Sequence, residues 1–332
     1  MEQMNAYICE KYGPPEVLQL SQVDKPVPGD KEVLIKVHAT TVNAADTNSR
    51  GLTHIPSGLG LLARVMLGFK KPRIPVQGTV VAGEVEAVGK DVRYFRAGDR
   101  VYGTGPELGG YAEYAIRKAE GAVAMIPENV SFEEAATIPY GALTAFYFLV
   151  DKARVGKGQK VLVNGASGGV GVFAVQIARY FGAEVSAVCS ARNADLVRSL
   201  GAYRVIDYAT EDFRESKEKW DIIFDMVVGK TSFKRSKKVL EPKGYYLAVA
   251  GGLNDMLHMI WTSIRGGRKV VFGGGTACEK QENLVFLNEL LENGEVKAVV
   301  DSIYPFDQMV EAHRQAESGS KKGSVAIRII QE

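Results

Sequence analysis

A short apolar strand that runs into a glycine-dense turn constrains this chain more than any other feature. The stretch covers residues 160–171 and reads KVLVNGASGGVG. The segment after it has apolar residues at helical spacing and ends at Gly182, where a C-terminal cap belongs. A second apolar strand follows at 184–189. This order predicts a βαβ unit with a dinucleotide site at its first turn, and the alternative is a tight turn in another kind of α/β protein.

Glycines give the predicted turn its chemistry. Gly168 is expected to let the chain reverse tightly, so that backbone N–H groups face an anion. Gly171 is expected to let the next helix lie close to the strand. That helix would point the positive end of its dipole at the pyrophosphate of a dinucleotide.

Length, charge and cysteine content are those of an ordinary globular enzyme. The 332 residues suggest two domains, and the net charge of +2 gives no argument for nucleic acid or an anionic membrane as a partner, so any positive patch must be local. The three cysteines form no C-x-x-C pair, which argues against a disulfide framework and a four-cysteine zinc lobe. No secretory signal or membrane span is visible, and we expect a cytoplasmic protein.

The first third of the chain reads as a β-barrel-like domain. Short strand-like runs at 33–37, 80–88 and 111–115 are separated by turn residues. A leucine-rich insertion at 55–69 is interpreted as a short helix or a flap. This insertion could be a helix buried against its own domain, or it could be a lid over the substrate.

The character of the sequence changes near Pro127. Ser131 and Glu134 resemble a capping box that opens a helix. Strands and helices then alternate, which predicts an α/β fold with a doubly wound parallel sheet, and the last segment could return to pack on the first domain. The predicted strands are 160–164, 184–189, 203–206, 221–225, 244–249 and 269–272, and the predicted helices are 170–181, 193–200, 231–240 and 281–292.

The residues after the second strand favour NADP(H) over NAD(H). An acidic residue there would bind the ribose hydroxyls and repel a 2′-phosphate, but the chain has Ser190 and Arg192, and no acid before Asp195. Arg192 can bind a phosphate with its planar fork, or it is a solvated residue at the start of a helix. Tyr208 could close over the same phosphate or the adenine, or it is an ordinary turn tyrosine.

Several separated motifs follow one another in a recognisable order over nearly the whole chain. They are 42–46 (VNAAD), 83–89 (GEVEAVG), 95–101 (FRAGDRV), 110–114 (GYAEY), 141–145 (GALTA), the glycine turn, 200–202 (LGA), 272–274 (FGG) and the tail pattern at 311–323. Together they resemble the medium-chain dehydrogenase/reductases, and within them the zinc-independent, zeta-crystallin-like quinone oxidoreductases.

The resemblance implies a GroES-like β-barrel catalytic domain at 1–127, completed by 276–332, and an inserted Rossmann NADP(H)-binding domain at 128–275. It also implies reduction of quinones or α,β-unsaturated carbonyls by NADPH, usually in a homodimer. The cofactor contacts that it implies are Thr144, Gly165, Ala166, Ser167, Gly168, Gly169, Val170, Gly171, Ala250, Gly251, Phe272 and Gly273.

On the substrate side, the resemblance would place Asn43 beside the nicotinamide and makes Asp46 a candidate for orienting the site. The alternative is a loop that these two side chains hold through bonds to the backbone. The family pattern commonly has a Tyr where this chain has Asn48, which leaves the proton donor unidentified, and water could supply the proton.

The ligands of zinc-dependent relatives are missing from the sequence. Those relatives have a Cys in the loop at 43–46 and a His-Glu pair after the glycine that precedes Thr79. No ordinary zinc site can be built without such ligands, so the prediction is NADPH without metal, with NADH less favoured.

We therefore expect hydride transfer to a quinone or an enone, with a hydrogen-bond donor such as Asn43 near the carbonyl oxygen where negative charge develops. Two alternatives stay open: an NADPH-binding sensor or scaffold with little turnover, and an alcohol dehydrogenase of the same superfamily.

Overall fold

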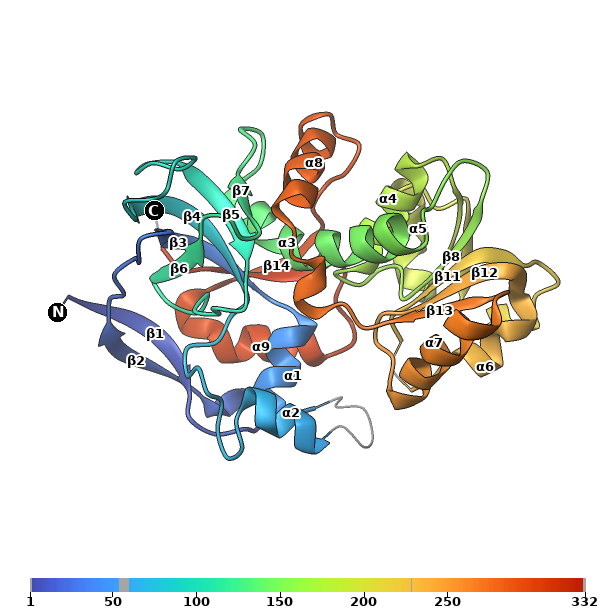
Figure 1. Cartoon of the computed structure of the whole chain (residues 1–332), viewed down its shortest axis with the longest axis horizontal. Helices are drawn as coiled ribbons and strands as arrows, with labels where there is room; N and C mark the ends of the chain where they lie inside the picture. The colour runs from blue at the N-terminus through green and yellow to red at the C-terminus, as the bar shows by residue number, and fades with distance from the viewer. Residues whose placement is uncertain (1, 54–59, 228, 331–332) are drawn as a thin grey trace. The chain divides into compact units, whose positions relative to one another are not determined.

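The computed structural model describes residues 2–53, 60–227 and 229–330. These residues form two compact units (Figure 1). The first unit consists of residues 2–53, 60–143 and 279–330, so two distant parts of the chain build it. The second consists of residues 144–278 apart from 228. Of the insertion predicted at 55–69, residues 54–59 lie outside the described part, and helix α2 (Gly60–Leu67) covers most of the rest.

A seven-stranded sheet is the framework of the first unit. Six strands run in the order β14-β15-β3-β4-β5-β7, and β6 pairs with β3. The bounds are β3 (Glu32–Val42), β4 (Val80–Val88), β5 (Arg100–Thr104), β6 (Tyr114–Lys118), β7 (Val123–Met125), β14 (Val300–Pro305) and β15 (Ser324–Arg328). A two-stranded antiparallel ribbon of β1 (Gln3–Cys9) and β2 (Leu18–Asp24) accompanies the sheet. Because β3 lies between neighbours, most of its side chains are buried, which accounts for its apolar sequence.

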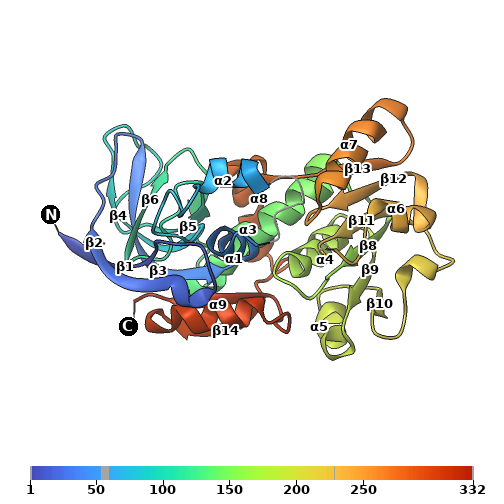
Figure 2. The same cartoon turned by 90° about the horizontal axis from the view of Figure 1, so that it is seen from below.

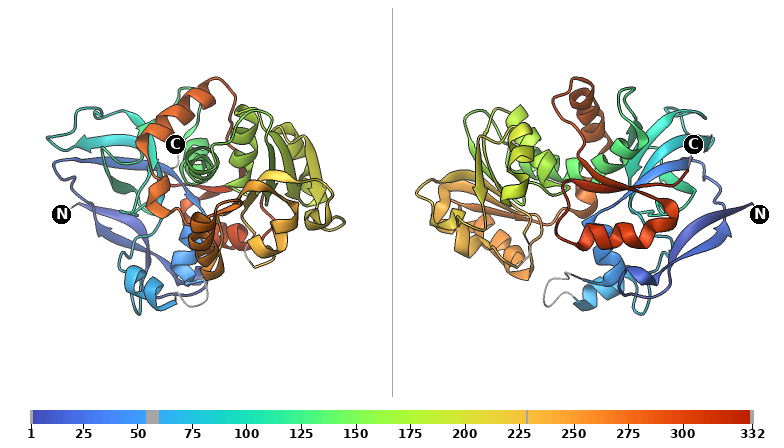
Figure 3. Two further views of the ribbon diagram at one scale, coloured as in Figure 1. Left: turned by 45° about the vertical axis from the view of Figure 1, so that its right-hand side comes forward. Right: turned by 180° about the vertical axis from the view of Figure 1, so that it is seen from behind.

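The last segment of the chain completes this sheet. Strand β15 pairs antiparallel with β3, with Val325 opposite Val42, and β14 pairs parallel with β15. Helix α9 (Met309–Glu317) connects the two strands and packs against both (Figure 3). The return of the last segment onto the first domain is therefore observed, and it brings residues 318–324 toward the end of β3.

Three further helices belong to the first unit, wholly or in part. Helix α1 (Ala44–Gly51) follows β3 directly, and helix α8 (Gln281–Glu292) matches its predicted bounds. Helix α3 (Phe132–Phe146) begins with the predicted capping box: the Ser131 N–H and Oγ both donate to the Glu134 carboxylate, and the Glu134 N–H donates to the Ser131 Oγ.

The second unit is a doubly wound sheet of six parallel strands. The order is β10-β9-β8-β11-β12-β13. The bounds are β8 (Lys160–Asn164), β9 (Glu184–Cys189), β10 (Arg204–Asp207), β11 (Trp220–Asp225), β12 (Leu240–Ala248) and β13 (Lys269–Phe272). Helices α4 (Gly171–Tyr180) and α5 (Ala194–Ser199) cover one face, and α6 (Phe233–Ser236) and α7 (Leu253–Arg265) cover the other (Figures 1 and 2). The strand order reverses between β8 and β11, where such sheets bind their ligands.

Two predicted elements differ from the structure in extent or position, and one helix was not predicted. The helix predicted at 231–240 is a four-residue α6 and a single 3₁₀ turn, because Leu240 already pairs with Trp220 in β12. The strand predicted at 111–115 lies at Tyr114–Lys118. Helix α7 was not predicted, although its apolar residues Leu253, Leu257, Ile260, Trp261 and Ile264 recur at helical spacing.

Candidate functional site

The glycine turn of the second unit is built around two backbone positions. Gly165 has a φ of +89°, the left-handed conformation that favours glycine. Gly171 begins α4, and a Cβ there would lie 2.3 Å from the Gly165 carbonyl oxygen. The prediction that Gly171 permits close packing is confirmed. Gly168 closes the tight turn, because its N–H donates to the Gly165 carbonyl at 3.1 Å, and the left-handed residue of the turn is Gly165, at the end of the strand.

The turn presents backbone amides at the start of a ten-residue helix. The N–H groups of Gly165 and Ala166 donate to the Val188 carbonyl, which fixes the turn on the neighbouring strand. No described acceptor receives the N–H of Ser167 or Val170. Both residues are partly exposed, as are Gly168 and Gly169. An uncommitted pair of amides at the positive end of a helix fits a pyrophosphate.

The buried carboxylate of Asp225 supports this turn through hydrogen bonds to the residues around it, and the sequence analysis did not identify it. One oxygen of Asp225 accepts from Asn164 Nδ2 (2.9 Å) and from the Val227 N–H (3.1 Å). The other accepts from the hydroxyls of Thr231 and Tyr246. Burial, followed by the charge of Asp225, raises the pKa of Tyr246, so this tyrosine stays protonated. Asp225 ends β11, beside the glycine-turn strand, and the carboxyl ends of parallel strands are where a search for site residues should look.

The residues predicted to select the cofactor gather where β9 and β10 end. Cys189 pairs with Asp207 in the sheet, and the Tyr208 N–H donates to the Cys189 carbonyl at 3.2 Å. Ser190 and Tyr208, which follow the two strand ends, are therefore neighbours. Arg192 is exposed in the 3₁₀ turn Ala191–Asn193.

Asn193, a buried residue of that same turn, was not predicted to contribute to the site. Its Nδ2 donates to the Ser167 Oγ at 2.9 Å, which joins the selectivity segment to the glycine turn. The prediction considered only residues that could touch the cofactor, so a side chain that links two segments went unnoticed.

Two predicted pairs meet at the end of β12 and β13. Ala248 pairs with Phe272, and a Cβ added at Gly251 would lie 2.9 Å from the Phe272 ring. Gly273 has a φ of +77° and open space around its α-carbon. Gly251 thus lies beside Phe272, and the cofactor contacts predicted for Ala250, Gly251, Phe272 and Gly273 stay predictions. Thr144 is half-buried in the last turn of α3.

In the first unit, Asn43 and Asp46 form a capping box at the start of α1. Asn43 Oδ1 accepts from the Ala45 N–H (2.8 Å) and the Asp46 N–H (3.2 Å). Asp46 in turn accepts from the Asn43 N–H (3.1 Å) and the Thr79 N–H (3.0 Å). Asn43 Nδ2 also donates to the Thr79 hydroxyl at 2.6 Å. Both side chains therefore hold two loops together, and the catalytic roles predicted for them stay predictions.

Behind this capping box lies a buried polar cluster. Burial raises the pKa of Asp46 to about 6, and hydrogen bonds from Asn43 and Thr79 limit the rise. Burial and the charge of Arg50 lower the pKa of His313 to about 3, so this histidine is neutral. The His313 ring meets the Tyr111 ring edge-on at 5.4 Å, and burial and the Asp46 charge raise the pKa of Tyr111. The partners of His313 are distant in the chain, so nothing local in the sequence marks this residue.

A lysine also approaches this cluster. The pairing of Val325 with Val42 carries the preceding loop toward Asn43, and Lys321 lies half-buried in that loop. Burial lowers the pKa of Lys321, whereas Asp301 and Asp46 raise it. The ammonium group is a hydrogen-bond donor that the sequence analysis did not consider.

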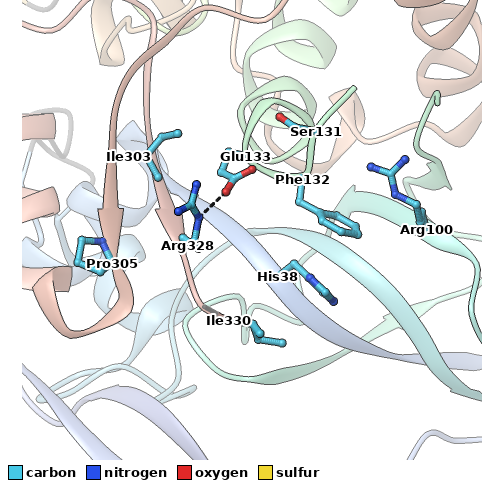
Figure 4. Close-up of a pocket in the computed structure, with 9 residues that line it drawn as sticks. All are labelled: His38, Arg100, Ser131, Phe132, Glu133, Ile303, Pro305, Arg328 and Ile330. Atoms are coloured by element: carbon cyan, nitrogen blue, oxygen red, sulfur yellow. Dashed lines mark hydrogen bonds and ion pairs between the residues drawn. The ribbon is translucent and has the colours of Figure 1, made fainter. Parts of the chain in front are cut away.

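The first unit also has a cavity of about 740 Å³ that none of the predicted site residues lines (Figure 4). Arg328 Nε donates to the Glu133 carboxylate at 2.6 Å on one side of it. On the other side the Phe132 ring stacks on His38 at 4.3 Å, and the Arg100 guanidinium lies 4.7 Å from its centre. Its cationic groups are thus already engaged by a carboxylate and by an aromatic ring.

Known families match both parts of the chain. Residues 29–128 match the family described as "Alcohol dehydrogenase GroES-like domain", and residues 200–327 match the one described as "Zinc-binding dehydrogenase". The human quinone oxidoreductase is 32% identical over 330 residues, which cover 96% of this chain and 95% of that protein. The chain belongs to the medium-chain dehydrogenase/reductase superfamily, in its quinone oxidoreductase group. It is an NAD(P)H-dependent oxidoreductase with a GroES-like and a Rossmann-like unit.

Other members of the group resemble this one along almost its whole length. The chloroplast envelope quinone oxidoreductase homolog of Arabidopsis thaliana is 34% identical, with 93% of each chain covered. The solved quinone oxidoreductase of Coxiella burnetii is 27% identical with a TM-score of 0.85, and covers 99% of this chain and 100% of its own. A mycobacterial protein solved in complex with NADPH has a TM-score of 0.80 at 27% identity, and covers 98% of this chain and 100% of its own.

Within the described ranges, no three His, Cys, Asp or Glu side chains are grouped so that they could hold a metal ion. Cys9, Cys189 and Cys278 are each buried as free thiols. Among the described helices, none is long and apolar enough to cross a membrane.

Proposed function

We propose that this protein reduces a quinone or an α,β-unsaturated carbonyl with NADPH and without zinc. The observation that carries the proposal is the glycine turn, where the left-handed Gly165 and the closely packed Gly171 place the amides of Ser167 and Val170 at the start of α4, where a diphosphate would bind. The NADPH-bound mycobacterial neighbour supports the choice of cofactor.

Residues of the second unit would hold the cofactor. The glycine turn would bind the pyrophosphate, while Ser190, Arg192 and Tyr208 would surround the 2′-phosphate. Ala250, Gly251, Phe272 and Gly273 would line the nicotinamide end, and Thr144 would add a hydroxyl. When bound, the reduced nicotinamide supplies a hydride, and the protein supplies placement and electrostatics.

On the substrate side, Asn43 would donate a hydrogen bond to the carbonyl oxygen where negative charge develops. Its side-chain amide is held in place, because Nδ2 donates to the Thr79 hydroxyl and Oδ1 accepts from the backbone N–H groups of Ala45 and Asp46. Asp46 would act as a positioning residue, since each of its carboxylate oxygens accepts a hydrogen bond from a backbone amide. We also propose that the protein is a homodimer in the cytoplasm. Light scattering of the purified protein tests the dimer, and fractionation of the cells that produce it tests the compartment.

The deciding experiment has three parts. Calorimetry should show that NADPH binds more tightly than NADH. Absorbance at 340 nm should fall when NADPH is mixed with the protein and a panel of quinones and enals. Metal analysis should find far less than one zinc per chain while the protein is active, and stoichiometric zinc needed for activity would refute the metal-free mechanism.

One observation favours a second candidate function, an NADPH-binding sensor or scaffold with little turnover. The side chains of Asn43 and Asp46 both serve to hold their loop, and Asn48 stands where the family commonly has a Tyr. Tight NADPH binding without oxidation by any member of the panel would select this alternative, whereas absence of nucleotide binding would refute both.

A further inference from the structure

Two arginines are fully buried in the first unit, and only one of them has a carboxylate partner. Arg50 is 2% exposed and forms an ion pair with Glu317. Arg117 is 1% exposed. In the described part of the chain no carboxylate forms an ion pair with Arg117, whose three hydrogen bonds all go to backbone carbonyls. Because an uncompensated buried charge destabilises a fold, its presence indicates that the charge has a use.

The position of the Arg117 guanidinium is fixed by those three carbonyls. Arg117 lies on β6, which pairs with β3, the strand that leads into the 43–46 loop (Figure 1). Its Nη1 donates to the Leu108 and Ile116 carbonyls at 2.5 and 2.8 Å, and its Nη2 donates to the Thr79 carbonyl at 3.1 Å. The first two bonds support the backbone around Leu108, whose φ is +58°. The third bond reaches the candidate site.

Thr79 joins Arg117 to the 43–46 loop. The Thr79 hydroxyl accepts from Asn43 Nδ2 at 2.6 Å, and the Thr79 N–H donates to Asp46 Oδ1 at 3.0 Å. One residue therefore contacts the guanidinium through its carbonyl and the Asn43 amide through its side chain. The positive charge lies a single residue away from the group that we propose as the hydrogen-bond donor to the substrate oxygen.

The charge of Arg117 acts against that of Asp46. The pKa of Asp46 is raised by burial to about 6, so its carboxylate is mostly ionised at pH 7 and opposes a negative charge on the substrate. Burial lowers the pKa of Arg117 to about 10, and nearby carboxylates limit the fall, so the guanidinium stays protonated. Because buried charges are weakly screened, the guanidinium offsets Asp46 from the other end of the Thr79 backbone.

We propose that Arg117 is a positioning residue for the reduction, and that its buried positive charge, held at the Thr79 carbonyl, stabilises negative charge on a substrate oxygen at the Asn43 amide. Hydride addition to the β-carbon of an enal moves an electron pair onto the carbonyl oxygen, and water then protonates the α-carbon of the enolate. Arg117 acts on the charge of that oxygen. The inference rests on the proposed function, since it takes Asn43 as the place where this charge develops.

Two substitutions separate the charge of Arg117 from its hydrogen bonds. Arg117→Gln keeps N–H donors without the charge, whereas Arg117→Lys keeps the charge without the planar fork. With an enal that the wild type reduces, kcat should fall roughly 30-fold in Arg117→Gln and less than about threefold in Arg117→Lys. The KM for the enal should stay within about twofold of the wild-type value, because the interaction strengthens only as charge develops.

Arg50 provides the matched control, because it is equally buried but its charge is neutralised by Glu317. Arg50→Gln should lower the melting temperature and keep kcat within about threefold of wild type. All rates are measured well below the lowest melting temperature, so that each variant is folded during the assay.

A change at Glu107 tests the charge even if loss of Arg117 prevents folding. The half-buried Glu107 is the carboxylate that contributes most to raising the pKa of Arg117. Glu107→Gln removes this negative charge and leaves Arg117 in place, so kcat should rise about twofold. Glu120→Gln, the same change at an exposed position just after β6, should leave kcat unchanged.

Three results would overturn the inference while the proposed function stands. One is an equal loss of kcat in Arg117→Gln and Arg117→Lys, which would show that only the hydrogen bonds matter. Another is a wild-type kcat in Arg117→Gln, and the third is an unchanged or lower kcat in Glu107→Gln. A wild-type protein that oxidises NADPH with no quinone or enal would instead refute the proposed function, and the inference with it.

Discussion

The two units hold their candidate site residues in opposite ways. In the second unit the glycine turn is shaped by backbone geometry, and its working groups are amides that any sequence with the same glycines would offer. In the first unit the 43–46 loop is shaped by side chains, because Asn43 and Asp46 form hydrogen bonds with Thr79 and with each other. A site made of backbone groups depends on residues that are neighbours in the sequence. A site made of side chains depends on partners that are distant in the sequence.

This contrast would break if a side chain proved decisive for the glycine turn. Asp225→Ala leaves the donors of Asn164 and Tyr246 buried without their acceptor, whereas the Thr231 hydroxyl can still donate to the Val227 carbonyl. Each unsatisfied donor costs about 1–3 kcal/mol, so we expect the free energy of unfolding to fall by roughly 4 kcal/mol. Urea denaturation measures the change. The control is Asp221→Ala on the same strand, where one bond from the Lys160 N–H is lost, and a loss as large as that of Asp225→Ala would contradict the network's importance.

The unfolding free energy should depend on pH because the 43–46 loop contains a buried carboxylate, Asp46. Because the folded-state pKa of Asp46, about 6, lies above its usual value of 3.8, the protein gains stability from this group as the pH falls below 6. The difference in unfolding free energy between the wild type and Asp46→Asn should therefore shift in favour of the wild type by up to about 3 kcal/mol between pH 7 and pH 4.

Comparison with the Asp46→Asn variant is essential because His313 acts in the other direction. Its pKa of about 3 lies below the usual 6.5, so stability is lost as the pH falls below 6.5. The wild-type profile alone mixes both effects. A difference between wild type and variant that stays constant with pH would contradict the raised pKa of Asp46.

Gly171 tests whether backbone packing shapes the glycine turn. A Cβ there would meet the Gly165 carbonyl at 2.3 Å, so Gly171→Ala must push the turn out of shape. We expect NADPH affinity to fall by roughly 100-fold, near the upper end of what overpacking costs. Gly168→Ala is the matched control for folding, because the nearest atom would be 3.4 Å away, and its melting temperature should be that of the wild type. Wild-type NADPH binding by Gly171→Ala would contradict the close packing.

What the sequence could predict follows the same division. The strands at 160–164 and 184–189 and the role of Gly171 could be predicted because their determinants are neighbours in the chain. That Gly165 is the left-handed residue of the turn could not be predicted, since a dense run of glycines does not say which one adopts that conformation.

The parts that could not be predicted depend on distant partners. Asp225 became visible as a support only when β11 was paired with β8, and His313 only when α9 was packed near Tyr111.

The smallest expected effect concerns cofactor choice, where the second unit relies on a side chain after all. Arg192 lies exposed just beyond the end of β9, next to Ser190, and a guanidinium there can form a paired hydrogen bond with a 2′-phosphate that NADH lacks. Arg192→Ala should weaken NADPH binding about tenfold, the value of one charge-assisted hydrogen bond, and should leave NADH binding almost unchanged. Arg198→Ala, an exposed arginine of α5 that pairs with Asp195, provides the control for general electrostatic attraction. Calorimetry with both nucleotides separates the cases, because equal weakening of NADPH and NADH would place Arg192 outside the phosphate site and leave the selectivity to Ser190 and Tyr208.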